Sequence, residues 1–221
     1  MNIDPNELIP AAIVVGIMLL VGLPVHEFSH ALVAFRLGDG TAKMFGRLTL
    51  NPVKHFDPVG GTLLALTFLG SGGSLGFGWA KPTPVNPMNL EGGRRGEALV
   101  AAAGPLSNLV LAIAGAIPLR YMIANPELIR QFPMFADVLA LFVQINLLLM
   151  IFNLIPIPPL DGSKVMFSFM DRRTDYQVRP FLEQYGFFIL LALLFLPPNN
   201  SIGARIIIPI LDGLFNFLVG R

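Results

Sequence analysis

The chain has 221 residues, of which 54% are hydrophobic and only 13% are charged, against roughly 25% charged in an ordinary soluble domain. The net charge is +1 and there is no basic stripe with interleaved aromatic residues, which argues against nucleic acid as a partner. The absence of cysteine excludes disulfides and thiolate metal sites, so any metal must be bound by His, Asp or Glu. The length and the long apolar blocks predict one compact, all-α polytopic domain whose surroundings are the lipid bilayer.

The first apolar stretch, residues 8–35, predicts a membrane span that Pro24 interrupts. It carries the motif His26-Glu27-Phe28-Ser29-His30. In a helix the two histidines lie one turn apart on one face and can bind one metal ion, while the glutamate acts as general base on a metal-bound water. Five loosely specified residues can match by chance. Two histidines and an acid at the end of a membrane helix are costly unless paired or ligated, however, so we predict a functional site.

Residues 36–57 are polar and basic. The alternating pattern of residues 43–50 predicts a short β-hairpin at the membrane surface. His55 follows this pattern, and two interpretations of it stay open. It orients the site, gates water or stabilises an oxyanion, or else it is an ordinary histidine of an interfacial loop.

The apolar run at residues 59–70 is short and ends in glycines, which predicts a re-entrant or interfacial segment rather than a full span. Residues 81–87 contain three prolines, which exclude a regular helix or a central strand there. Full spans are predicted for residues 97–119, 135–155, 181–197 and 202–219, the last one weaker because Pro209 and Asp212 interrupt it. In the span at 97–119, small residues allow close helix packing and Asn108 can bond to another helix.

The span at 135–155 leads into a proline-rich end that carries Asn153 and delivers the carboxylate of Asp161 in a Leu-Asp-Gly sequence. Asp212 lies in a second Leu-Asp-Gly and is the rival metal ligand. It lacks the upstream Asn and prolines, so we favour Asp161. Asn153 has two interpretations, a group that holds substrate and an amide that packs between helices.

A shared metal requires the histidines and Asp161 at the same membrane face. The histidines lie at the C-terminal end of the first span and Asp161 lies just beyond the C-terminal end of the span at 135–155, so a single complete crossing, residues 97–119, must separate these two spans. The charge distribution agrees, since residues 36–97 hold seven Lys or Arg and residues 157–180 hold four, whereas residues 120–134 hold two. By the positive-inside rule, the metal site is expected toward the cytoplasmic face of the cell membrane.

The motifs His26-Glu27-Phe28-Ser29-His30, Ala103-Gly104-Pro105-Leu106-Ser107-Asn108 and Asn153-Leu154-Ile155-Pro156-Ile157-Pro158-Pro159-Leu160-Asp161-Gly162 together resemble the site-2 protease family of intramembrane zinc metalloproteases. The resemblance covers roughly residues 10–165, and the regions around residues 51–58 and 78–82 are similar to a compact bacterial branch without PDZ or CBS domains. We therefore expect residues 1–165 to form the protease core and residues 166–221 to add C-terminal helices to the same domain.

The resemblance also implies site roles. His26, His30 and Asp161 would bind one zinc ion per chain, Glu27 would be the general base, and Asn153 would help to hold the substrate backbone. The substrate would be the transmembrane segment of another membrane protein.

Two other functions compete with proteolysis. A non-proteolytic membrane zinc-binding protein would keep the ligands, but it would have no need of the base Glu27. A small ion or proton transporter could use the acid and the histidines as a relay, but the sequence shows no internal repeat of the kind many transporters carry.

Overall fold

The computed structural model describes residues 12–13, 15–70, 78–197 and 201–220, and no strand occurs within these ranges. The elements are η1 (Met18–Gly22), α2 (Leu23–Arg36), α3 (Thr41–Met44), α4 (Pro52–His55), α5 (Pro58–Gly70), η2 (Pro87–Asn89), α6 (Arg94–Ala124), α7 (Pro126–Gln131), α8 (Pro133–Asn153), α9 (Asp161–Phe169), α10 (Arg172–Phe195) and α11 (Ile202–Val219). Five helical segments are long and apolar enough to cross a membrane: Val15–Arg36, Arg94–Ala124, Pro133–Asn153, Arg172–Phe195 and Ile202–Val219. The prediction of an all-α, polytopic membrane protein is confirmed.

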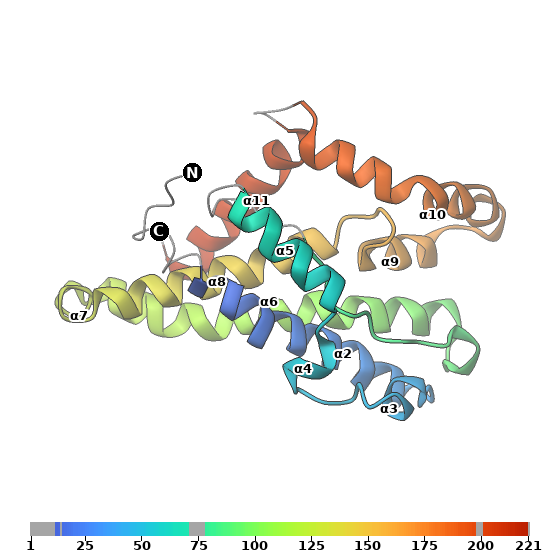
Figure 1. Ribbon diagram of the computed structural model, residues 1–221, viewed down its shortest axis with the longest axis horizontal. Coiled ribbons are helices and arrows are strands. Elements are labelled where there is room, and N and C mark those ends of the chain that lie inside the picture. The colour runs from blue at the N-terminus through green and yellow to red at the C-terminus, as the bar shows by residue number, and fades with distance from the viewer. Residues whose placement is uncertain (1–11, 14, 71–77, 198–200, 221) are drawn as a thin grey trace.

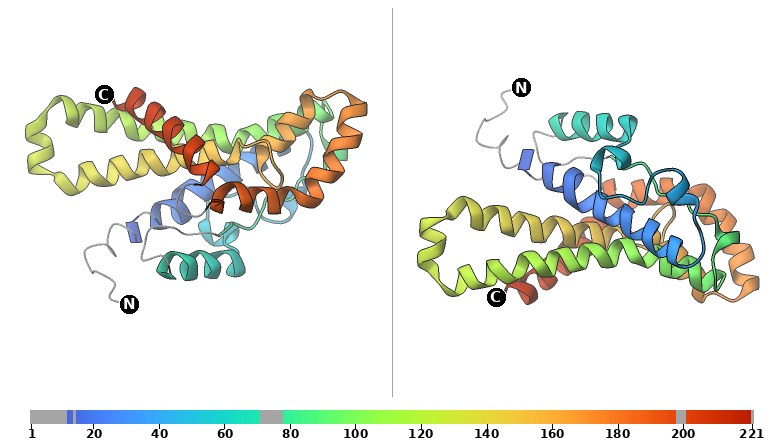
Figure 2. Two further views of the ribbon diagram at one scale, coloured as in Figure 1. Left: turned by 90° about the horizontal axis from the view of Figure 1, so that it is seen from above. Right: turned by 90° about the horizontal axis from the view of Figure 1, so that it is seen from below.

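The core is built from three helices. α6 and α8 run antiparallel along the long axis of the molecule, joined by α7 at one end, and α2 lies against the opposite half of α6 (Figures 1 and 2). Ala112 and Ala116 of α6 pack against Val143 and Leu147 of α8, and all four are buried. These helices are in close contact, because a Cβ added at Gly115 would lie only 2.7 Å from the ring of Phe142.

The first helix continues through Pro24 instead of ending there. It widens into a π-helix over Met18–Gly22, directly before the α-helix that begins at Leu23. A proline has no N–H and its ring crowds the preceding turn, and a wider turn relieves both problems. One consequence is a polar link at this turn, where the Asn108 side chain donates to the carbonyl of Gly22 at 3.1 Å.

The predicted β-hairpin at residues 43–50 is wrong. The Asp39 carboxylate accepts the N–H of Thr41 at 3.0 Å and starts a single helical turn, α3, and Gly46 then turns the chain with φ +67°. The side chain of buried Arg47 donates to the Lys54 carbonyl. Hydrogen bonds from side chains to the backbone thus build a compact loop, and the alternating pattern finds no partner strand.

α5 begins where Asp57 caps it, because one carboxylate oxygen accepts the N–H groups of Val59 and Gly60 at 2.9 Å each. Its 13 residues rise about 20 Å, too little for a hydrocarbon core of roughly 30 Å. The chain then returns to the start of α5, since Lys81 N donates to the carbonyl of His55 at 2.8 Å. α5 stands apart from the core helices (Figure 2). Because the chain returns to His55, just before the start of α5, the structure supports the predicted re-entrant segment.

Ion pairs join the segments at the other end of α6 from α7. Arg94 pairs with Asp175 at 3.4 Å and Arg179 pairs with Glu97 at 3.0 Å, so α10 begins beside the start of α6. These pairs fix α10 to the core at the end where α2 finishes, and Arg94 also donates to the Phe167 carbonyl of α9 (Figure 1).

α10 and α11 together run from the start of α6 toward α7. α11 ends at the far end of α6, where a Cβ added at Gly220 would lie 3.0 Å from Nε of Arg120. α10 and α11 form a bent pair, and α11 runs unbroken through Pro209 to cover α6 and α8 (Figure 2). The two predicted C-terminal spans are therefore both helices, and together they make one net passage along the core.

Candidate metal centre

Three potential metal ligands meet between α2 and α9. Nε2 of His26 lies 3.1 Å from Oδ2 of Asp161, and Nε2 of His30 lies 3.0 Å from the same oxygen. The two Nε2 atoms are 3.0 Å apart. All three side chains are buried, with exposed fractions of 3%, 7% and 8% for His26, His30 and Asp161. Within the described part of the chain they form the one group of His, Asp or Glu side chains arranged to hold a metal ion.

The other nitrogen of each ring has a fixed partner. Nδ1 of His26 is 2.7 Å from Oδ1 of Asn108, and Nδ1 of His30 is 2.6 Å from the carbonyl oxygen of Val100. The Asn108 orientation follows from its Nδ2, which donates to the carbonyl of Gly22 and to Oδ1 of Asn146, both at 3.1 Å. Both Nδ1 atoms therefore donate, and in the neutral form of each ring Nε2 carries a lone pair.

Two lone pairs and a carboxylate oxygen thus face one another at hydrogen-bond distance without a proton to share. A cation resolves this conflict, and histidines whose Nδ1 donates to an oxygen are typical of metal sites. Two imidazoles and one carboxylate are a known donor set for catalytic zinc. The residues present therefore fit a zinc ion.

Two glycines create the space for this arrangement. A Cβ added at Gly104 of α6 would lie 2.4 Å from Nε2 of His30 and 2.6 Å from Nε2 of His26, so any side chain there would occupy the centre. A Cβ at Gly162 would lie 2.2 Å from the carbonyl oxygen of Leu154. Gly162 therefore lets α9 start directly against the end of α8, which brings Asp161 to the histidines.

The Asp161 carboxyl is suited to ligate as an anion. Burial alone would raise its pKa, but the adjacent rings of His26 and His30 outweigh burial and hold that pKa well below its usual range. Nζ of Lys164 lies 4.0 Å from the other carboxylate oxygen, Oδ1. One carboxylate oxygen of Asp161 thus faces the histidines, and the other faces the ammonium group of Lys164.

Glu27 and Asn153 lie outside this group. Glu27 is half-buried, and its Oε2 accepts the backbone N–H of Thr83 at 2.8 Å. Asn153, the last residue of α8, donates from Nδ2 to the carbonyl of Leu149 in its own helix at 2.9 Å.

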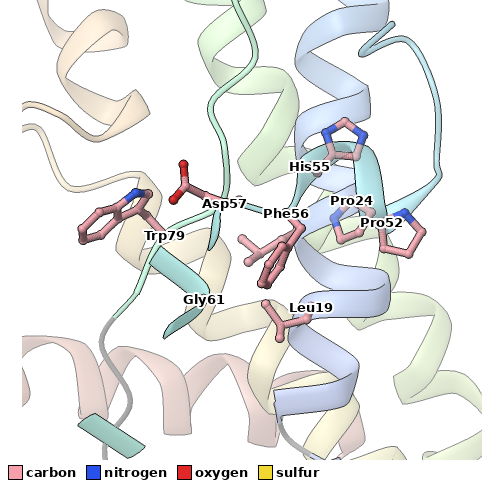
Figure 3. A pocket seen from close by; sticks show the side chains of 10 residues that line it. Leu19, Pro24, Pro52, His55, Phe56, Asp57, Gly61 and Trp79 are labelled. Carbon is pink, nitrogen blue, oxygen red and sulfur yellow. The ribbon is translucent and has the colours of Figure 1, made fainter. Parts of the chain in front are cut away.

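His55 and Asp212 do not join the metal ligands either. His55 is 2% exposed, and its Nε2 is 2.7 Å from the carbonyl oxygen of Thr49, whereas its Nδ1 has no hydrogen-bond partner among the described residues. It borders a pocket that Pro24, Phe56 and eight other residues line beside α2 (Figure 3). Asp212 is exposed on α11.

Several residues that contact the candidate ligands or Glu27 were not predicted from the sequence. The predicted bonding of Asn108 between helices is confirmed, but its partner Asn146 went unnoticed, although a fully buried amide inside an apolar helix is a signal in itself. The Thr83 N–H and the Val100 carbonyl offered no sequence signal, because both are backbone groups.

Comparisons with known proteins agree with this chemistry. The model of peptidase family M50 matches residues 122–197. YwhC of Bacillus subtilis strain 168, named as a candidate zinc metalloprotease, is 38% identical over 210 residues, which cover 94% of this chain and 89% of YwhC. Rip2 of Mycolicibacterium smegmatis, named in the same way, is 32% identical over 200 residues, covering 90% of this chain and 73% of Rip2. No solved structure matches the chain significantly.

Proposed function

Because this chain belongs to peptidase family M50, the site-2 proteases, and is a multi-pass zinc metallopeptidase, we propose that it cuts peptide bonds in or near transmembrane segments of other membrane proteins. The observation that carries this proposal is the position of the buried group His26, His30 and Asp161. It lies among apolar helices long enough to cross a membrane, where the peptide bonds of a transmembrane substrate would be.

We propose that His26, His30 and Asp161 hold one zinc ion per chain. Three protein ligands, rather than four, are typical of a catalytic zinc site. When bound, zinc would supply Lewis acidity toward the scissile carbonyl and lower the pKa of a water molecule. Asn108 and the Val100 carbonyl keep the imidazoles in the tautomer that can ligate.

The remaining roles belong to side chains beside the metal ligands. Glu27 takes a proton from the attacking water and later gives it to the leaving amine. Asn153 holds the substrate backbone, because it stands at the end of α8 where the chain turns toward Asp161. His55 supports the loop beside α2 through Thr49 and is a candidate for orienting the site indirectly.

The proposal is tested with protein purified in detergent and reconstituted in liposomes. We expect about one zinc ion per chain and cleavage of a synthetic transmembrane substrate, with cleavage lost on chelation and restored by zinc. Zinc binding without cleavage of any transmembrane substrate would favour the non-proteolytic binding protein instead.

The Asn108 carbonyl group should control zinc affinity. Asn108→Leu removes the acceptor of His26 Nδ1, so we expect zinc to bind roughly 10 to 100 times more weakly. Competition with a chromophoric chelator measures this affinity. Asn125→Leu is the matched control, because Asn125 is exposed at the far end of α6 and its side chain donates to the Tyr121 carbonyl there. Unchanged affinity in Asn108→Leu would show that the bond to His26 does not orient the ligand.

We further propose that the metal site lies toward the cytoplasmic face, because the basic residues gather at its end of the molecule. Single cysteines at the exposed positions Asn89, Arg173 and Asn125 of this cysteine-free chain report the topology. An impermeant thiol reagent added to intact cells should label only Asn125→Cys. Asn89 and Arg173 are separated by the two spans α6 and α8 and therefore share a face, so a fourth cysteine at the exposed position Lys54 tests the intervening segment. Labelling at Asn89→Cys but not at Lys54→Cys would make residues 59–79 a full crossing.

A further inference from the structure

Residues 81–91, which we call the clasp, run along α2 and are fixed at both ends. Lys81 N donates to the carbonyl of His55 and Glu91 N donates to the carbonyl of Leu37, both at 2.8 Å. Between these points the clasp passes the half-buried Glu27. A segment 56 residues away in sequence is therefore held against the proposed general base.

One clasp residue holds Glu27 twice. The backbone N–H of Thr83 donates to Oε2 of Glu27 at 2.8 Å, and the Thr83 hydroxyl donates to the backbone carbonyl of Glu27 at 3.0 Å. The first bond fixes the carboxylate and the second fixes the clasp to the same turn of α2. Oε1, the second carboxylate oxygen, takes no part in either bond.

The local sequence sets up this contact. Pro82 and Pro84 flank Thr83, and a residue that precedes a proline is restricted to extended conformations. In an extended segment the N–H groups of residues 81 and 83 lie on one edge, here the edge that faces the protein. The prolines have no N–H, so the outer edge has no donor at residues 82 and 84. The sequence thus directs the Thr83 donor inward.

A buried carboxylate anchors the rest of the clasp. Asp39 is fully buried and accepts Asn86 N at 2.7 Å and Asn89 Nδ2 at 3.2 Å, in addition to the N–H and hydroxyl of Thr41. Burial works to raise the Asp39 pKa, but the hydrogen bonds from Thr41, Asn86 and Asn89 outweigh it and hold that pKa below its usual range. The anchor is therefore an anion at neutral pH.

We propose that Thr83 is a positioning residue for Glu27, held in place by the Asp39 anchor, an inference that rests on the proposed proteolytic function. A glutamate side chain has several rotatable bonds, and a general base works only when its oxygen stays within hydrogen-bond reach of the proton it takes. Thr83 holds Oε2, which leaves Oε1 at a fixed place for the attacking water. A shift of about 1 Å in such a group costs roughly a hundredfold in rate.

Three substitutions at Thr83 test this role. Thr83→Val removes the hydroxyl, Thr83→Pro removes both donors while suiting an extended backbone, and Thr83→Ser keeps both. We expect kcat for a transmembrane substrate to fall roughly tenfold in Thr83→Val and up to a hundredfold in Thr83→Pro, with KM, zinc content and helix content unchanged. Thr83→Ser should restore nearly the wild-type kcat.

Thr62→Val is the matched control, because Thr62 is exposed on α5 and donates its hydroxyl to the Pro58 carbonyl of the same helix. Asp39→Asn loosens the anchor without touching Glu27 and should lower kcat in the same direction. A higher kcat in Thr83→Val would make the clasp inhibitory, and loss of zinc or helix content with activity would make Thr83 merely structural. Either result overturns the inference, as does unchanged kcat in all variants. If the wild-type protein itself neither binds zinc nor cuts, the proposed function fails instead.

Discussion

Glu27→Gln should abolish cleavage of a transmembrane substrate while the protein keeps about one zinc ion per chain. The amide has the shape of the carboxylate but does not take a proton, and general base catalysis alone contributes roughly 10² to 10⁴ in rate. The amide oxygen can still accept the Thr83 N–H, so the clasp stays in place. Zinc is measured by atomic absorption, and kcat/KM is measured with a fluorogenic transmembrane substrate.

Glu127→Gln serves as the control, because Glu127 is exposed on α7 and pairs with Arg130 at 2.8 Å, far from the metal centre. It should leave both zinc and cleavage unchanged. Cleavage by Glu27→Gln above about a hundredth of the wild-type rate would remove Glu27 from the role of base. Loss of zinc from this variant would instead make Glu27 a ligand.

The parts of the site that depend on local spacing could be predicted from the sequence. His26 and His30 are four residues apart, so any helix places them together, and hydropathy alone predicts the helix. The nearness of Asp161 followed from the number of complete crossings, because that number decides which residues lie at the same membrane face. The structure brings these three side chains together.

The parts that depend on contacts between distant backbone groups could not be predicted. Nothing in the sequence near Thr83 indicates that its N–H meets Glu27, because a backbone donor is the same at every non-proline residue. The predicted hairpin failed for a related reason. An alternating pattern favours a strand only if a partner strand is present. Here the side chains of Asp39 and Arg47 instead form hydrogen bonds with the Thr41 N–H and the Lys54 carbonyl of the loop.

Asp161→Ala should lose the bound zinc, whereas Asp212→Ala should leave zinc content and cleavage nearly unchanged. Asp161 contributes the oxygen that lies 3.0 Å and 3.1 Å from the two histidine nitrogens. Loss of an outer partner of a ligand already weakens binding roughly 10 to 100 times, so loss of the ligand itself should exceed about a hundredfold. Dialysis against a weak chelator, followed by metal analysis of both variants, measures the difference.

Asp212→Ala is the matched control, because both aspartates lie in a Leu-Asp-Gly sequence but differ in their surroundings. Asp212 is exposed on α11, where a charge is unfavourable in an apolar helix, so alanine there should if anything ease insertion. Zinc retained in Asp161→Ala and lost in Asp212→Ala would place the third ligand on α11. That helix would then have to turn its exposed face toward α2, which its packing through Ile207 and Val219 against α6 and α8 opposes.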